Sequence, residues 1–181
     1  MRIIGGKNKG KKLILPDETI TRPTTDRVRE SLFNILSHHP DFDWNGAYVL
    51  DAFAGSGALG LEALSRGAAH VTFVESHPKI IPILKQNMEA VSGDKNLLTH
   101  PIEKILPTSR PMDLVLLDPP YKKELEIPIL THLKNQGWIN NDTLVCLEMH
   151  RQDDLPEIHW FQCLDHRQYG QTKIIFGKLQ A

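Results

Sequence analysis

An α/β fold with an open, mostly parallel sheet is the fold class that this sequence predicts. Short apolar segments alternate along the chain with segments whose apolar residues recur at helical spacing. A glycine-rich turn joins the first of these strands to a helix, which is the opening unit of nucleotide-type α/β folds. The last two apolar segments flank the short turn 169–171, which indicates a terminal antiparallel hairpin. The seven expected strands cover residues 47–50, 70–75, 96–100, 112–117, 143–148, 161–168 and 172–179.

Helical segments fill the intervals between these strands. Residues 26–36 carry Val28, Leu32, Ile35 and Leu36 on one face, behind a linker that ends in helix-capping residues. Further helices are expected over residues 58–64, 80–91 and 125–133, with a helical turn at 102–106. This alternation of strand and helix favours a parallel sheet covered on both faces.

The size and composition of the chain exclude several classes of protein. Its 181 residues suit one domain, and 40% hydrophobic with 24% charged residues is typical of a folded globular protein. No apolar run approaches the roughly 20 residues that span a bilayer, and no signal peptide is visible. Cys146 and Cys163 lack the spacing of metal ligands. We therefore expect a cytoplasmic, metal-free protein, and we expect it to be a monomer.

Positive charge is concentrated at the beginning of the chain. Residues 1–29 hold eight basic and three acidic residues, whereas the remainder holds 13 basic and 19 acidic residues. A basic head on an acidic body predicts a polyanionic partner bound at one end, although a solvated basic tail is the alternative.

Residues 1–15 predict a small β-hairpin with a basic tip, because two apolar pieces flank a Gly/Asn/Lys turn. A hairpin of this size must pack on the body or become ordered on a partner. We treat residues 1–20 as an extension of a main domain that covers residues 21–181. The side chains expected to contact the phosphates of such a polyanionic partner are those of Arg2, Lys7, Lys9, Lys11 and Lys12.

The glycine-rich turn reads DAFAGSGALG over residues 51–60. Gly55, Gly57 and Gly60 match the dinucleotide pattern G-x-G-x-x-G, in which glycines let the backbone approach a ligand. Asp51, at the end of the preceding strand, argues against a pyrophosphate, because a carboxylate repels it. A ligand with positive charge or hydroxyl groups suits this turn better.

Three acids are expected at the carboxyl ends of strands, namely Asp51, Glu75 and Asp118. Ligands of open α/β sheets bind beyond these ends. Glu75 follows Gly55 by 20 residues, a spacing that suits a carboxylate accepting both hydrogen bonds of a ribose diol. No Lys-Ser/Thr follows the glycines, so a Walker A phosphate loop is excluded. S-adenosylmethionine, which has a ribose and two cationic groups but no phosphate, fits this set of acids.

The segment Asp118-Pro119-Pro120-Tyr121 is the more specific motif. Paired prolines fix a rigid backbone after a buried strand, so that the Asp118 carboxylate and the Pro119 carbonyl can accept from one exocyclic amine. Tyr121 offers a ring on which a flat base can stack. Transfer of a methyl group from a sulfonium to such an amine depends mainly on positioning and electrostatics. The alternative is that the motif merely ends a strand and that Tyr121 packs.

These motifs carry a resemblance to a known family. The Asp118 segment resembles the Pro-Pro motif of amino-methyltransferases that act on adenine N6, guanine N2 or glutamine. Four segments together resemble the RsmD family: residues 2–6, 22–30, 51–66 and 169–172. The resemblance implies a Rossmann-like class I methyltransferase that uses S-adenosylmethionine. It also implies N2-methylguanine as the product, made at one position of 16S ribosomal RNA in the assembled small subunit.

The resemblance also implies roles for individual residues. It assigns cofactor binding to Asp51, Phe53, Gly55, Ser56, Gly57 and Glu75, together with Arg22 and Thr24, and catalysis to Asp118, Pro119, Pro120 and Tyr121. One segment departs from the family pattern, since His100-Pro101-Ile102 stands where many of these enzymes place Asp or Asn near the adenine. Backbone groups of Ile102 are the alternative contact for that ring.

Other functions remain open from the sequence. An NAD-binding oxidoreductase would use the same glycine pattern, but Asp51 and the lack of an evident catalytic His/Lys arrangement disfavour it. An RNA-binding assembly factor with a vestigial pocket would not require the Asp118 motif. Among methyltransferases, DNA adenine N6 and protein glutamine remain alternative targets.

Overall fold

The structure, a computed structural model, describes residues 1–17, 26–119, 125–154 and 157–180. Arg22, Thr24, Pro120 and Tyr121, four of the predicted site residues, lie outside the described residues. The helices and strands are α1 (Asp26–Leu36), β1 (Tyr48–Asp51), α2 (Ala58–Arg66), β2 (His70–Val74), α3 (Ile81–Ala90), β3 (Asp94–Leu98), the 3-10 helix η1 (Ile102–Lys104), β4 (Leu114–Leu117), α4 (Glu126–Asn135), β5 (Leu144–His150), β6 (Phe161–Tyr169) and β7 (Thr172–Leu179).

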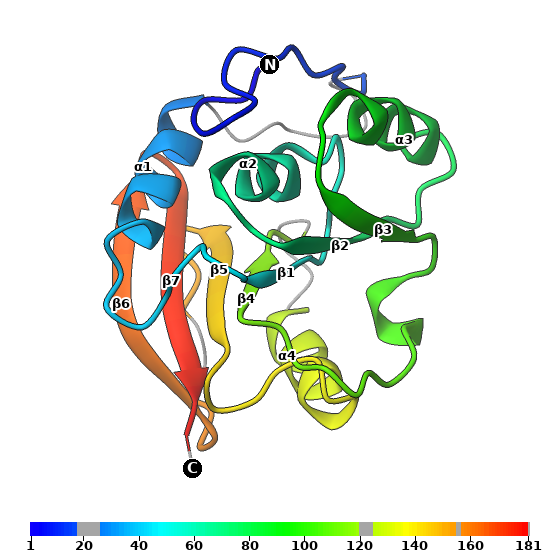
Figure 1. Ribbon diagram of the computed structural model, residues 1–181. Coiled ribbons are helices and arrows are strands. Elements are labelled where there is room, and N and C mark those ends of the chain that lie inside the picture. Colours follow the sequence, from blue (N-terminus) through cyan, green and yellow to red (C-terminus); the bar gives the residue numbers. More distant parts are fainter. Residues whose placement is uncertain (18–25, 120–124, 155–156, 181) are drawn as a thin grey trace.

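The strands form one seven-stranded sheet in the order β3-β2-β1-β4-β5-β7-β6 (Figure 1). Strands β1 to β5 are mutually parallel, β7 is antiparallel to β5, and β6 is antiparallel to β7. The predicted fold class, a mostly parallel sheet with a terminal antiparallel hairpin, is therefore confirmed. The strand order reverses between β1 and β4, and the crevice beyond the carboxyl ends of these two strands is where such sheets bind ligands.

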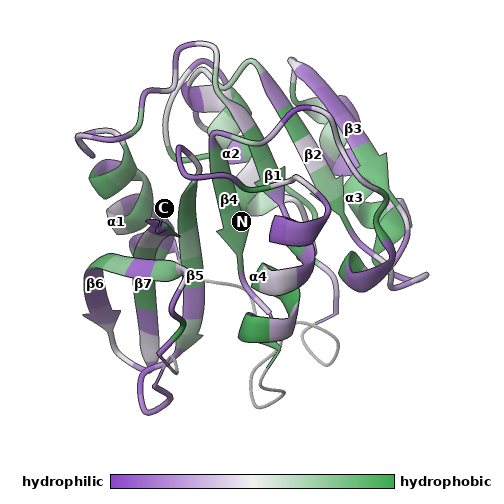
Figure 2. Ribbon diagram, turned by 90° about the horizontal axis from the view of Figure 1, so that it is seen from below, coloured by the Kyte–Doolittle hydropathy of each residue, from purple (hydrophilic) through white to green (hydrophobic). Residues whose placement is uncertain are grey.

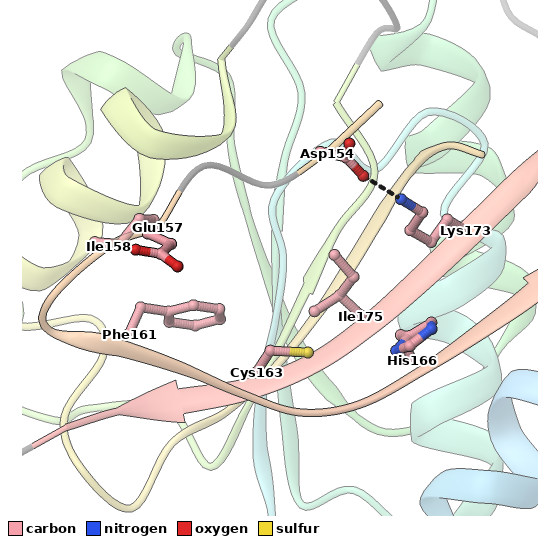
Figure 3. Close-up of a pocket in the computed structure, with 8 residues that line it drawn as sticks. All are labelled: Asp154, Glu157, Ile158, Phe161, Cys163, His166, Lys173 and Ile175. Atoms are coloured by element: carbon pink, nitrogen blue, oxygen red, sulfur yellow. Dashed lines mark hydrogen bonds and ion pairs between the residues drawn. The ribbon is translucent and has the colours of Figure 1, made fainter. Parts of the chain in front are cut away.

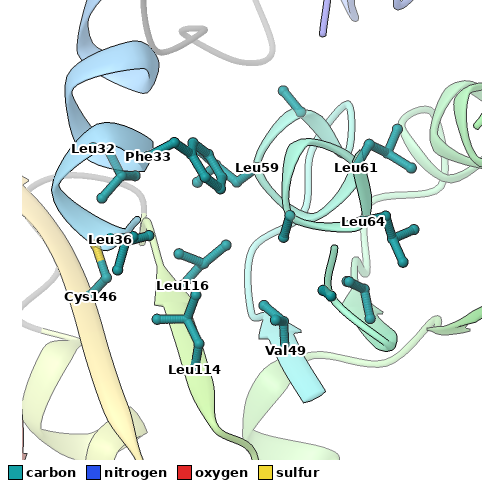
Figure 4. Packing of buried hydrophobic residues seen from close by; sticks show 14 of the residues in the cluster. Leu32, Phe33, Leu36, Val49, Leu59, Leu61, Leu64, Leu114, Leu116 and Cys146 are labelled. Carbon is teal, nitrogen blue, oxygen red and sulfur yellow. The ribbon is translucent and has the colours of Figure 1, made fainter. Parts of the chain in front are cut away.

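Helices cover both faces of the sheet. Helices α1, α2 and α3 lie on one face, and α4 and η1 lie on the other (Figure 1). Strand β4 is buried along its whole length, so its four residues alternate between the two hydrophobic cores. Leu114 and Leu116 lie on the α1 side of the sheet, with Leu36 of α1 beside them (Figure 4). In Figure 2 the central strands are accordingly hydrophobic, and hydrophilic positions lie on the helices and on β6.

The element boundaries differ from the predictions at several ends. Strand β3 begins at Asp94 and ends at Leu98, two residues earlier at each end than the predicted 96–100. Helix α3 runs from Ile81 to Ala90 with Ile80 as its N-cap, one residue shorter at each end than the predicted 80–91. Pro82 lies in its first turn, where a missing N–H costs no hydrogen bond.

The N-terminal arm, defined here as residues 1–17, forms the short hairpin that the sequence predicts. Arg2 and Lys12 pair as an antiparallel bridge, and the backbone N–H groups of Ile3, Gly10 and Leu13 donate across the hairpin to the carbonyls of Lys11, Ile3 and Met1. The arm is also held by the body, because the backbone N–H groups of Ile4 and Gly5 donate to the Glu62 carboxylate at 2.7 and 2.8 Å. Ile3 and Leu13 are buried in the core beside α2. The arm is thus ordered both by its own pairing and by contacts with the helices beneath it.

Gly6 shows how closely the arm approaches α2. Its φ is +71°, and an added Cβ would lie 1.8 Å from the backbone oxygen of Ser65. Only glycine fits this contact. The boundary predicted at residue 20 falls within residues 18–25, which the structure does not describe.

Candidate functional site

Acidic side chains gather where adjacent parallel strands end. Asp51 is the last residue of β1, and Glu75 directly follows β2. Asp118 directly follows β4. The fourth acid, Glu148 of β5, was not among the predicted site residues. Leu117 pairs with Leu147, so Asp118 and Glu148 are the next residues along two neighbouring strands. The acids therefore follow the order β2-β1-β4-β5 across the sheet edge.

Asp51 is the most deeply buried of these acids. Its side chain is 2% exposed, and its Oδ2 accepts a hydrogen bond from the backbone N–H of Gly60 at 2.8 Å. Burial raises the pKa of Asp51 from 3.8 to about 7; the Gly60 hydrogen bond opposes this rise and the charge of Glu75 adds to it. The carboxyl is thus poised to ionise at neutral pH, and a cationic ligand beside it would favour the ionised form.

Glu75 holds the rim of the glycine turn. Its Oε2 accepts from the backbone N–H of Gly55 at 3.0 Å, and its Oε1 accepts from the N–H of His77 at 2.7 Å. Each carboxylate oxygen has a second lone pair, so both remain able to accept from hydroxyl groups. Acceptor oxygens at the end of the second strand suit the hydroxyl groups of a ribose.

Each of the three glycines in the turn is required for a different structural reason. An added Cβ on Gly55 would meet nothing within 4 Å, so this residue faces open space. On Gly57 it would lie 2.6 Å from Leu84 of α3, and on Gly60 it would lie 2.3 Å from Phe73 of β2. Gly55 and Gly57 also have positive φ angles of +53° and +81°. Gly55 alone thus leaves room on the ligand side, while the other two allow close packing of the helices and strand.

Two further predicted cofactor residues lie in this turn. Phe53 is partly buried and packs against the core beneath α4. The backbone oxygen of Ser56 accepts a hydrogen bond from the side chain of Asn87 in α3 at 2.8 Å. Ile102, the alternative contact for an adenine ring, is buried at the start of η1.

The described part of the Asp118 motif lies next to Glu148. Asp118 is partly buried and Pro119 is buried. The charges of Asp118 and Glu148 both raise the pKa of the buried Cys146 thiol, after the larger effect of burial itself. Cys146 precedes Glu148 by two positions and faces the α1 core, so Glu148 points to the same face of β5. The signal that could have identified Glu148 was its place at the end of a predicted parallel strand.

The basic side chains of the arm lie away from these acids. Arg2, Lys7, Lys9, Lys11 and Lys12 are all exposed. The backbone N–H of Lys7 donates to Ser65 near the end of α2, and the Lys11 ammonium donates to the Ala90 carbonyl at the end of α3. Both helices begin at the ligand edge of the sheet and end at the opposite edge. The structure therefore places the arm's basic tip about one helix length from the acids.

Lys95 of β3 joins this basic surface. Partial burial lowers the pKa of its ammonium; Asp94 opposes this effect, and the positive charges of Lys7 and Lys11 add to it. Its Nζ also donates to the backbone oxygens of Val91 and Gly93. Sequence reasoning missed Lys95, because no local pattern shows that β3 begins beside the arm.

A separate depression of about 600 Å³ lies over the β6–β7 hairpin (Figure 3). Ile158, Phe161 and Ile175 give it an apolar floor, with Cys163 and His166 at one side. Lys173 at its margin already donates to the Asp153 carbonyl and the Asp154 carboxylate at 2.6 and 3.2 Å. None of the four acids lines this depression. It is therefore distinct from the site at the ends of β1 and β4.

The described residues offer neither a metal site nor a membrane-spanning helix. Within the ranges that the structure describes, no group of three or more His, Cys, Asp or Glu side chains is arranged to hold a metal ion. No helix among those residues is long and apolar enough to cross a membrane.

Comparison with known proteins agrees with this geometry. Residues 1–178 match the family described as Conserved hypothetical protein 95. The chain is 38% identical to Ribosomal RNA small subunit methyltransferase D of Escherichia coli (strain K12) over 160 residues, which cover 87% of this chain and 79% of that protein. It is also 38% identical to YlbH of Bacillus subtilis (strain 168) over 185 residues, which cover 98% of both chains.

A solved structure shares the whole fold. The structure of yhhF from Escherichia coli superposes with a TM-score of 0.86 at 34% sequence identity, and the match covers 100% of this chain and 98% of that one. The sheet order, the glycine turn with its acids and these relatives agree on one family. The chain therefore belongs to the RsmD family of ribosomal RNA methyltransferases.

Proposed function

We propose that this protein transfers a methyl group from S-adenosylmethionine to the exocyclic N2 of a guanine in 16S ribosomal RNA. The observation that carries the proposal is the buried Asp51 carboxyl, with a pKa raised to about 7, beside a turn rimmed by Glu75. A site edged by acids disfavours phosphate groups and favours a ligand that brings positive charge and a ribose.

The donor is assigned to the ends of β1 and β2. Asp51 would face the cationic groups of the methionine part, and Glu75 would accept from the ribose hydroxyls. Gly55 leaves open space beside them, where the backbone can approach the ligand. Phe53, Ser56 and Gly57 complete this side through the turn they share. Arg22 and Thr24 are assigned to the donor by their match to the family motif alone.

The acceptor is assigned to the ends of β4 and β5. Asp118 and the Pro119 carbonyl would accept from the guanine N2 amine, and Pro120 would keep the backbone rigid beside Tyr121, on which the base would stack. Glu148, next in register to Asp118, offers a second carboxylate for the N1–H of the same base edge. Adenine has a lone pair at N1, which a carboxylate repels, so this pair of acids favours guanine.

The chemistry demands little proton transfer before the methyl group moves. The N2 nitrogen forms a bond to the methyl carbon as the sulfur–carbon bond breaks, and the sulfur leaves as a neutral thioether. The nitrogen, which is then positively charged, loses one of its two original protons to solvent or to the Asp118 carboxylate. Holding nitrogen, methyl and sulfur in line supplies most of the rate, together with carboxylates placed where positive charge develops.

The basic arm is assigned to the RNA backbone. Its exposed cations, Arg2, Lys7, Lys9, Lys11 and Lys12, would contact phosphates without reading sequence. The partner is then the small ribosomal subunit, met in the cytoplasm by a monomer. An RNA that reaches from the acids to the basic tip must extend along α2, whose nine residues measure about 13 Å at 1.5 Å per residue.

The decisive experiment supplies labelled S-adenosylmethionine to the protein with naked 16S RNA, assembled small subunits, DNA or protein, followed by analysis of the labelled product. Labelled N2-methylguanine from the RNA samples is expected. N6-methyladenine or methylglutamine would refute the guanine assignment. A calorimetric titration with NAD in parallel tests the oxidoreductase alternative, because tight NAD binding without S-adenosylmethionine binding would overturn the proposal.

A further inference from the structure

We propose that Asn87 is a positioning residue for methyl transfer. Its side-chain amide holds two segments in one arrangement: the glycine-rich turn over residues 51–60, called the donor turn below, and the N-terminal arm. The buried side chains of α3 are Leu84 and Asn87. Asn87 is only 2% exposed. A buried amide destabilises the fold unless its polar atoms are paired, so its place on the core side of a helix needs a specific explanation.

Hydrogen bonds supply that explanation. The Nδ2 of Asn87 donates to the backbone oxygens of Ser56 and Ile14, each at 2.8 Å. Its Oδ1 accepts from the backbone N–H of Ile14, also at 2.8 Å. Both amide hydrogens and the amide oxygen are thus used, and the two carbonyl partners fix which end of the amide is nitrogen.

A hydrogen bond to the Ser56 carbonyl restrains the backbone in the middle of the donor turn. It belongs to the peptide unit that joins Ser56 to Gly57, and the N–H of the same unit donates to Ala54. Hydrogen bonds therefore restrain both the C=O and the N–H of this peptide unit, and Asn87 supplies the one to the C=O. One residue earlier, the Gly55 N–H donates to Glu75, the proposed ribose acceptor. A rotation of the Ser56 peptide would disturb that hydrogen bond as well.

Leu84 supports the same turn from one helical turn earlier. Its Cδ1 lies so close to Gly57 that an added Cβ there would come within 2.6 Å. The two buried residues of α3 thus contact two successive residues of the donor turn, 56 and 57. A helix that merely covered the sheet would need only apolar contacts here.

The N-terminal arm is the second segment that Asn87 holds. Ile14 gives both its main-chain N–H and its C=O to Asn87, in the manner of a strand paired with a partner. The arm lies over α2 and α3 (Figure 1) and carries the lysines assigned to RNA. One side chain thus connects the RNA-facing arm to the donor turn. This inference rests on the proposed function, because it takes the turn as the S-adenosylmethionine site.

Three variants test the inference. Asn87→Leu has similar size but loses all three hydrogen bonds. Asn87→Asp keeps the acceptor but loses the donors while it is ionised. Thr143→Val is the matched control: Thr143 is equally buried and donates to Met112 at 2.6 Å, but it lies at the opposite edge of the sheet, where β5 begins. S-adenosylmethionine binding is measured by calorimetry, donor KM and kcat by labelled-methyl transfer, and folding by thermal denaturation.

We expect Asn87→Leu to raise the Kd and KM for the donor on the order of tenfold, since small misplacements of binding groups have effects of this size. Thr143→Val should keep the wild-type Kd even if it lowers the Tm. For Asn87→Asp, a buried carboxyl is protonated more easily and its O–H can then donate, so the Kd ratio to wild type should recover as the pH falls from 8 to 5.5.

Several outcomes would overturn the inference. A folded Asn87→Leu or Asn87→Asp protein with wild-type donor affinity would show that Asn87 only attaches the arm. A Thr143→Val protein that lost donor affinity equally would show a general effect of lowered stability. If Asn87→Leu fails to fold, the pH dependence of Asn87→Asp decides. Absence of binding in the wild-type protein would instead refute the proposed function itself.

Discussion

The buried carboxyl of Asp51 accepts a 2.8 Å hydrogen bond from the backbone N–H of Gly60, two positions beyond the first residue of α2. The same carboxyl has a pKa raised to about 7, so one hydrogen bond does not offset its burial. A buried acid that titrates at neutral pH stores unfavourable free energy when it is ionised. A cation bound beside Asp51 would offset this unfavourable free energy.

Asp51 should make stability depend on pH in a defined direction. The folded-state pKa of about 7 exceeds the ordinary 3.8, so the folded protein binds the extra proton between these pH values. Protonation of Asp51 therefore stabilises the folded protein fully below about pH 4. This stabilisation, about 4 kcal/mol in total, is lost as the pH rises to about 7. Asp51→Asn should therefore be more stable than wild type at pH 8 and similar at low pH, as measured by chemical denaturation. A difference that stays constant across this range would contradict the raised pKa.

Donor binding should release a proton near pH 6.5 for the same reason. A cationic ligand favours the ionised carboxylate, so S-adenosylmethionine binding should expel the proton from Asp51. Calorimetric titrations in buffers of different ionisation enthalpy measure this release. Asp51→Asn should show none, and its donor affinity should fall at least tenfold with the loss of about 1.4 kcal/mol or more of charge interaction.

Gly55→Ala and Gly57→Ala form a matched pair. Both residues have positive φ, which costs roughly 1–2 kcal/mol for a side chain. At Gly57 the new Cβ would also press on Leu84, which adds about 1–3 kcal/mol of overpacking. We expect thermal denaturation to show the greater loss for Gly57→Ala. Gly55→Ala should instead lose donor affinity, because its Cβ enters the open space assigned to the ligand. Equal Tm losses would contradict this division.

Asp118→Ala should separate turnover from donor binding. The acid is assigned to the acceptor amine, so its removal should lower kcat by about 10²- to 10³-fold, as for other lost electrostatic contacts in a transition state. The donor Kd should change by less than about threefold, well below the tenfold that 1.4 kcal/mol represents. Calorimetry and labelled-methyl transfer on the same preparation give both values. A comparable loss of both would show that Asp118 belongs to the donor side.

Glu148→Gln tests the second acid of the acceptor side. An amide cannot replace a carboxylate towards a guanine N1–H without turning its own N–H groups away, so methyl transfer should fall roughly 10-fold or more. The exposed Glu103→Gln serves as the control and should behave as wild type. If Glu148→Gln methylates guanine at the wild-type rate, the carboxylate does not contact the base.

The arm lysines should determine how RNA binding responds to salt. Lys11 also contacts the end of α3, so the cleaner variant replaces Lys7, Lys9 and Lys12 with Ala. Each lost phosphate contact should reduce the slope of log K against log salt by about 0.7–0.9. Filter binding to 16S RNA between low and moderate salt measures the slope, and the exposed Lys104→Ala is the control. An unchanged slope would assign the arm a structural role only.

Local sequence was sufficient for the fold class and for three of the acids. Alternating apolar segments and helical periodicity identified the seven strands and four α-helices found in the described part of the chain, because burial on one or two faces imposes those periods. Asp51, Glu75 and Asp118 were found since a parallel sheet brings the carboxyl ends of its strands to one edge. The same rule would have found Glu148. Element ends shifted because caps are decided by contacts that sequence does not show, as at Ile80.

Only the tertiary structure decided which distant groups meet. The sequence gives no reason to pair Ile14 with Asn87, Ile4 with Glu62, or Lys95 with the lysines of the arm. These contacts join segments more than 50 residues apart, and their energies depend on burial and on orientation. The raised pKa of Asp51 has the same origin. Its side chain is an ordinary carboxylic acid in the sequence, and it becomes a group that titrates at neutral pH because the fold removes it from water.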